Sequence, residues 1–140
     1  MGERRRAREL AVQVLFHLEF NPDDPSEVFD LICENFDARK SIRDFSRKLV
    51  LGVTEKKEAL DKAISGASKN WRIDRMARLD RSILRLAAFE IMFIQDIPAK
   101  VSLDEAVEIG KKFGSENSGR YINGVLDRIY NSMLQNGELE

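Results

Sequence analysis

The chain has 140 residues, of which 43 % are hydrophobic and 34 % are charged, and its net charge is −1. This composition is typical of one soluble globular domain, and the small net charge argues against binding polyanions through bulk charge alone. A single cysteine, Cys33, excludes an internal disulfide, and a single histidine, His17, argues against a zinc site. No apolar segment approaches the roughly 18 residues of a membrane span, so we expect a cytoplasmic protein without a metal or cofactor.

Charge is segregated along the chain. Residues 21–37 contain six acids and no base, whereas residues 69–85 contain six bases and two acids. Such blocks predict one positive surface instead of a uniformly mixed one.

The first predicted helix runs from about Arg4 to Phe20 and ends at the turn NPDDP. Its apolar residues have the i, i+3, i+4, i+7 spacing of one buried stripe: Ala7, Leu10, Ala11, Val14, Leu15 and Leu18. Four arginines stand at its start, where the helix dipole favours acids: Arg4, Arg5, Arg6 and Arg8.

The opposite face of this helix is also unusual. At about 100° per residue, Val12 and Phe16 fall outside the buried stripe and near Arg5 and Arg8. An apolar patch beside arginines is typical of an interface with protein or nucleic acid. The alternative is that Phe16 packs under the acidic loop while the arginines are solvated.

The middle of the chain predicts two further helices. Ser26 is a candidate cap for a helix through about Phe36, and a long helical pattern follows from about Ser41 to Ser68. Gly52 and Gly66 interrupt the long pattern, and a close helix crossing at Gly52 would explain a residue that disfavours helices.

The second half of the chain is also helical. A short turn or helix is predicted near 72–76, and the next helix, 79–94, is apolar almost all round, as in the centre of a bundle. Ser102 and Glu105 form a capping-box pattern that opens a helix to about Phe113, with Gly114 as C-cap. A last helix runs from about Ser118 to Leu134. The sequence therefore predicts an all-α fold of about seven helices in two packed groups that divide near residue 70.

No catalytic motif is present. The sequence lacks a nucleophile elbow, a Walker A loop and a dinucleotide-binding fingerprint, so we expect no catalytic residues. Glu90 lies on an apolar side of the central helix, where a catalytic carboxylate would need a partner carboxylate or base. The simpler interpretation is a buried carboxylate satisfied by an arginine or by a helix N-terminus.

A second candidate site is the segment KKFGSENSGRYINGV. Lys111, Lys112 and Arg120 flank a turn that ends at Tyr121. Cations and an aromatic ring at a helix N-terminus can bind phosphate and stack an unpaired base. The alternative is an ordinary helix connection with a half-buried Tyr121.

Four segments, taken together, carry a resemblance: RRRARELAVQVLF, LDRSILRLAAFE, IPAKVSLDEAVEIGKKFG and RYINGVLDRI. In this order and at these positions they resemble the NusB family of bacterial transcription antitermination factors. The similarity spans Arg4 to about Ile129. The block 97–124 is the most specific, because a generic amphipathic helix pair would not reproduce both of its motifs.

The resemblance implies a single domain, 1–140, with two helical subdomains of about 1–70 and 71–140, and no enzymatic activity. It implies binding to the boxA element of nascent ribosomal RNA transcripts together with NusE, a small-subunit ribosomal protein. The pair would join an RNA polymerase antitermination complex. Arginines would contact phosphates, and stacking and base edges would supply specificity.

The resemblance also implies site residues. The RNA-binding positions carried over are Arg4, Arg5, Arg6, Arg8, Asn117, Arg120 and Tyr121. Phe16 and Asp80 match positions on or near the shared RNA and NusE surface. Asn117 stands where other members can carry an acid, and Tyr121 where phenylalanine is common. Neither departure removes a cation or a ring, so we expect RNA binding to be retained.

Two other functions fit parts of this pattern. NusB-like helical domains also occur fused to RNA methyltransferases, but 140 residues leave no room for a catalytic domain. The first helix could instead mediate a homodimer, which is compatible with RNA binding.

Overall fold

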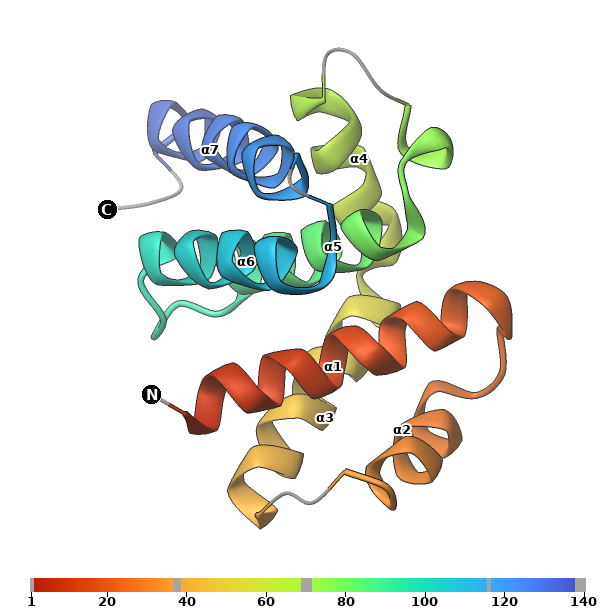
Figure 1. The fold of residues 1–140 in the computed structure, drawn as a ribbon. Coiled ribbons are helices and arrows are strands. Elements are labelled where there is room, and N and C mark those ends of the chain that lie inside the picture. The colour runs from red at the N-terminus through yellow and green to blue at the C-terminus, as the bar shows by residue number, and fades with distance from the viewer. Residues whose placement is uncertain (1, 37–38, 69–71, 116, 138–140) are drawn as a thin grey trace.

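The computed structural model describes residues 2–36, 39–68, 72–115 and 117–137, and within these ranges every regular element is helical (Figure 1). Seven α-helices and one 3-10 turn follow in order: α1 (Glu3–Phe20), α2 (Pro25–Cys33), α3 (Lys40–Glu55), α4 (Lys57–Ala67), η1 (Ile73–Arg75), α5 (Arg78–Phe93), α6 (Ala99–Phe113) and α7 (Ser118–Gln135). The all-α prediction is confirmed. None of the described helices is long and apolar enough to cross a membrane.

The helices form two groups around α5. α1 packs against α2 and α3, α6 packs against α7, and α5 contacts both sets (Figure 1). Every residue of α5 from Ser82 to Ile91 is buried, as the all-round apolar pattern predicts. The division into subdomains near residue 70 stays a proposal. Because α4 packs mainly against α5 and α7, we favour an earlier boundary, at Lys56.

The expected close crossing at Gly52 is confirmed. A Cβ atom on Gly52 would lie 2.1 Å from Cζ of Phe89, so α3 and α5 approach closely only because that side chain is absent. The single long helix expected from Ser41 to Ser68 is wrong. The chain breaks at Lys56, where φ is −99° and ψ is 15°, and α4 leaves in a new direction to reach α7.

Two helix starts also differ from expectation. Asp24, and not Ser26, caps α2: its carboxylate accepts a hydrogen bond from the Glu27 N–H at 3.2 Å. Pro25 follows at the first helical position, which suits its fixed φ. α6 begins at Ala99 directly after Pro98, so the predicted capping box at Ser102 is wrong, and Ser102 lies inside the helix.

Candidate nucleic-acid interface

Three of the four arginines of α1 lie over aromatic rings, and the two exposed ones, Arg4 and Arg6, lie closest. The guanidinium carbon of Arg4 lies 4.3 Å from the ring centroid of Phe45, and that of Arg6 lies 4.7 Å from the ring centroid of Phe36. Such cation–π contacts contribute about 0.5–1 kcal/mol at exposed sites. Arg4 and Arg6 are exposed residues, and their side chains cover one ring on α3 and one just after α2.

Arg8 forms a buried ion pair with Glu90. Its Nε donates to Glu90 Oε2 at 2.9 Å and its Nη2 to Oε1 at 2.8 Å, while Ser102 Oγ donates to Oε1 at 2.8 Å. The two charged side chains are 4 % and 1 % exposed. The simpler interpretation of Glu90 is therefore confirmed, with an arginine as its partner.

The outward position expected for Arg8 and Val12 is wrong. Val12 is 3 % exposed, and Arg8 shares its helix face at i, i+4 spacing. α1 packs against α3 and also against α5, so two of its faces are buried and not one. Phe16 is 36 % exposed, as expected.

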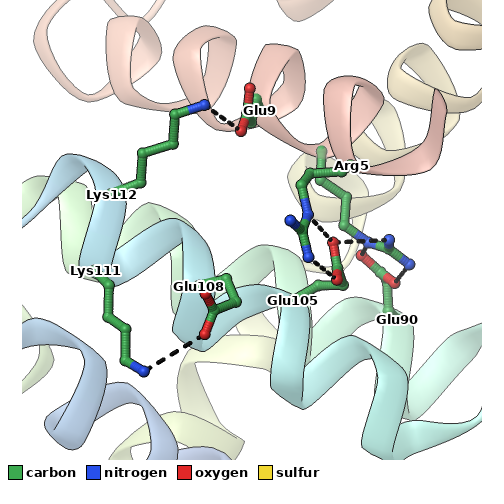
Figure 2. A network of polar contacts seen from close by, with 8 residues as sticks. Arg5, Glu9, Glu90, Glu105, Glu108, Lys111 and Lys112 are labelled. Atoms are coloured by element: carbon green, nitrogen blue, oxygen red, sulfur yellow. Dashed lines mark hydrogen bonds and ion pairs between the residues drawn. The ribbon is translucent and has the colours of Figure 1, made fainter. Parts of the chain in front are cut away.

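Arg5 forms a more exposed pair with Glu105 of α6. Its Nε donates to Glu105 Oε1 at 2.9 Å and its Nη2 to Oε2 at 2.7 Å, with side chains that are 41 % and 18 % exposed (Figure 2). The hydrogen bond from Arg5 has the largest effect on the pKa of Glu105 and lowers it. Burial opposes this shift, and the positive charge of Arg5 adds to it, so the pKa is lowered overall. The same contact raises the pKa of Arg5, so both groups are fully charged near neutral pH.

Two further ion pairs involve lysines of α6, one with α1 and one within α6 itself. Lys112 Nζ lies 3.0 Å from a Glu9 carboxylate oxygen, and Lys111 Nζ lies 3.5 Å from one of Glu108 (Figure 2). Lys111 and Lys112, which the sequence offered for phosphate binding, therefore each have a carboxylate partner. RNA would have to compete for these cations.

A pocket of about 240 Å³, here called the turn pocket, opens between η1, the start of α5 and the α6–α7 turn. Asp80, Asn117 and Tyr121 all line it, so the fold brings together three expected residues from two distant segments. Arg75 also lines it and was missed; the basic block 69–85 was its only sequence signal. Arg120 is exposed on the first turn of α7, one residue before Tyr121.

Tyr121 has features of both alternatives considered for this turn. It is half-buried, and its hydroxyl forms a 2.9 Å hydrogen bond with Ser68 Oγ, as in an ordinary helix connection. Ser118 Oγ accepts from the Ser115 N–H at 3.0 Å, which tightens the turn. The Tyr121 side chain nevertheless remains part of the wall of the turn pocket.

Phe16, Phe20 and Arg78 form an exposed cluster at the end of α1, here called the aromatic patch. The Phe16 ring packs edge-on against Phe20, with centroids 5.0 Å apart, and Arg78 stacks on Phe20 at 4.6 Å. Asp80 lies in the same first turn of α5 as Arg78. The aromatic patch and the turn pocket thus adjoin the same end of α5.

Glu19 anchors the end of α1 on α5. It accepts hydrogen bonds from Arg81, at 3.1 Å from Nε, and from Arg85. Burial would raise the pKa of Glu19, but the hydrogen bond from Arg81 and the charge of Arg85 together lower it. These contacts position Phe16 relative to the start of α5.

No group of three or more His, Cys, Asp or Glu residues in the described ranges is placed to hold a metal ion.

Comparison with known proteins identifies close relatives. The model of the NusB family matches residues 5–131. The transcription antitermination protein NusB of Pelotomaculum thermopropionicum is 50 % identical over 129 residues, which are 92 % of this chain and 90 % of that protein. The NusB of Geobacter sulfurreducens is 44 % identical over 138 residues, covering 98 % of this chain and 100 % of that protein.

Solved structures agree with these relatives. T. maritima NusB superposes with a TM-score of 0.85 at 37 % identity, over 91 % of this chain and 90 % of that one. A chain from a crystal structure of the antitermination factors NusB and NusE in complex with dsRNA superposes with a TM-score of 0.87 at 28 % identity, over 94 % and 98 %. The chain therefore belongs to the NusB family of non-enzymatic transcription antitermination factors.

Proposed function

We propose that this chain binds boxA RNA of nascent ribosomal transcripts together with NusE, and that the pair joins an RNA polymerase antitermination complex in the cytoplasm. Membership of the NusB family supports this proposal, as does the similarity to a protein crystallised with NusE and dsRNA. The observation that carries it is the convergence of Asp80, Asn117 and Tyr121 in one pocket.

The turn pocket has the chemistry to hold one unpaired base. Its volume of about 240 Å³ is below the roughly 300 Å³ at which drug-sized pockets begin, and it has an aromatic wall in Tyr121. Stacking on an aromatic ring gives affinity, while Asp80 and Asn117 supply an acceptor and an amide for base edges. Arg75 in the wall and Arg120 beside it supply positive charge for the adjoining phosphates.

The start of α1 would continue this RNA-binding surface. Arg4 and Arg6 are exposed residues and Arg5 is half-buried, so a phosphate can reach this part of the surface. We assign Arg8 a different role, because its guanidinium is buried against Glu90. Its effect on RNA binding would come from holding α1 in place.

The aromatic patch is the proposed NusE surface. Phe16 and Phe20 are 36 % and 52 % exposed, and Arg78 covers one of the two rings. Exposed aromatic rings with an arginine are typical of the centre of protein interfaces. Asp80 lies between this patch and the turn pocket, so it could contact either partner.

A titration of fluorescently labelled boxA RNA, with and without purified NusE, tests the proposal. We expect Tyr121→Ala to weaken RNA binding about tenfold, because a stacked base contributes about 1–3 kcal/mol. Tyr121→Phe keeps the ring and loses only the Ser68 hydrogen bond, so binding should be retained. Equal binding by the wild type and Tyr121→Ala would contradict the base-stacking assignment.

The partner surface needs a separate measurement. Phe16→Ser and Asp80→Arg should each weaken NusE association, with helicity unchanged by circular dichroism. A homodimer formed through α1 is the competing use of this surface. Sedimentation with and without boxA RNA distinguishes the two, because a dimer that persists and ignores RNA would contradict the proposed function.

A further inference from the structure

The Arg5–Glu105 pair lies in the wall of a second pocket, of about 350 Å³, between the start of α1 and the α5–α6 connection. Ile97, Pro98 and Val101 form an apolar part of its lining, and Val101 is 44 % exposed. The pair is thus at the edge of an open space and not packed inside the fold. A group from outside can approach the guanidinium of Arg5.

Glu105 lies between two guanidinium groups. Arg5 binds both of its oxygens (Figure 2). Arg8 Nη1 lies 3.9 Å from Oε1. If Arg5 turned away, Glu105 would keep the positive charge of Arg8 nearby. Arg8 itself is held by Glu90 and cannot follow.

A phosphodiester resembles the carboxylate that Arg5 already binds. Both carry one negative charge and two oxygens that accept the paired N–H groups of a guanidinium. Arg5 can therefore exchange Glu105 for a phosphate without losing the geometry of its hydrogen bonds. The exchange releases the Glu105 carboxylate, and that cost reduces the gain from the phosphate.

We propose that Glu105 competes with RNA phosphate for Arg5, and so lowers the sequence-independent part of the RNA affinity. This inference rests on the proposed function, in which RNA crosses the start of α1. Glu105 is not itself an RNA ligand. Glu105 determines how strongly Arg5 contributes to the RNA affinity.

The proposal predicts the salt dependence of binding. Each phosphate that a protein cation neutralises releases counterions and steepens the plot of log affinity against log salt by about 0.7 for single strands. In the wild type the freed Glu105 carboxylate takes up a cation and offsets this release. Without the carboxylate, the full release should be measured.

Glu105→Gln tests this in the full chain. The matched control is Glu58→Gln, which removes the same charge from an exposed position on α4, outside the surface proposed for RNA. The probes are a boxA RNA and a scrambled RNA of equal length, titrated at several NaCl concentrations. Thermal unfolding by circular dichroism verifies that each variant is folded.

We expect Glu105→Gln to bind both RNAs about two- to fivefold more tightly than Glu58→Gln does, which corresponds to the loss of one exposed ion pair. Its salt slope should steepen by up to about 0.7. In the double variant Arg5→Gln Glu105→Gln this gain should disappear, because the cation that Glu105 restrains is absent.

The outcomes separate this inference from the proposed function. Tight boxA binding by the wild type, with no difference between Glu105→Gln and Glu58→Gln, would overturn the competition alone. A gain that survives in the double variant would also overturn it. If the wild type, with and without NusE, bound neither RNA, the proposed function and this inference would both be wrong.

Discussion

Arg8–Glu90 and Arg5–Glu105 are two arginine–glutamate pairs, formed from the first two turns of α1. Their hydrogen bonds are almost the same length, at 2.9 and 2.8 Å in one and 2.9 and 2.7 Å in the other. They differ in access to water. The side chains of the first pair are 4 % and 1 % exposed, and those of the second are 41 % and 18 % exposed.

The comparison teaches that burial, and not hydrogen-bond geometry, decides what a paired arginine can do. Releasing one partner of a buried pair leaves an uncompensated charge in a low-dielectric interior, at a cost of about 3–5 kcal/mol. An exposed pair exchanges its partner cheaply, because water and salt take over the charges. Arg8 is therefore a fixed part of the fold, whereas Arg5 remains able to bind a phosphate.

The largest expected effect is on the buried pair. Glu90→Gln should lower the free energy of unfolding by about 3–5 kcal/mol, because Arg8 keeps its charge without a compensating carboxylate. The free energy of unfolding is measured by urea denaturation, with circular dichroism as the probe. A loss below about 1 kcal/mol would mean that Arg8 is solvated, and the comparison would fail.

Removing both buried charges should restore most of that loss. Arg8→Met Glu90→Met replaces the pair with apolar groups of similar length, and such exchanges are often neutral or stabilising. Because Arg8 is assigned no phosphate contact, the salt slope of boxA binding should equal that of the wild type. A slope shallower by about 0.7 in this folded variant would show that Arg8 contacts RNA directly.

Arg5→Gln should give the opposite pattern. Its stability should remain close to that of the wild type, while boxA affinity falls severalfold and the salt slope becomes shallower by up to about 0.7. Lys62→Gln is a control of equal charge change, because Lys62 is on α4 in a different pocket. If both variants changed the salt slope equally, net charge alone would explain the effect, and a specific contact between Arg5 and phosphate would be contradicted.

The smallest expected effect is on the acid dependence of stability. Arg5 lowers the pKa of folded Glu105 below its ordinary value of 4.5, so its ionised form stabilises the folded state above that pH. This contribution should be lost as the pH falls through the lowered pKa. Unfolding midpoints of the wild type and Glu105→Gln, measured between about pH 3 and pH 6, should therefore converge at the acid end. A difference that stays constant with pH would contradict the pairing.

Much of the fold could be predicted from local pattern. The stripe of α1 and the all-round apolar α5 each depend on residues within one or two turns of a helix. Gly52 indicated a close helix crossing, but only the structure shows that its partner is Phe89 of α5. The break at Lys56 could not be predicted in this way. It depends on where α4 finds a packing surface, on α5 and α7, and both lie outside the segment that contains the break.

The candidate site divides in the same manner. The arginines of α1 and the turn before Tyr121 stand out in the sequence, and the resemblance to the NusB family added Asp80 and Asn117. That three of these residues line one pocket was not evident from any segment alone. Arg75 was missed because an exposed arginine in a basic block has no periodic signal.

By itself, the sequence determined that this protein is helical, that Glu90 needs a buried partner, and that cations gather at the start of α1. Only the tertiary structure decided which cation meets which acid. Helix periodicity fixes the angle of a side chain around its own helix, but its burial depends on how many neighbours that helix has. α1 has neighbours on two sides, so Arg8 became part of the interior while Arg5, three residues earlier, kept its access to solvent.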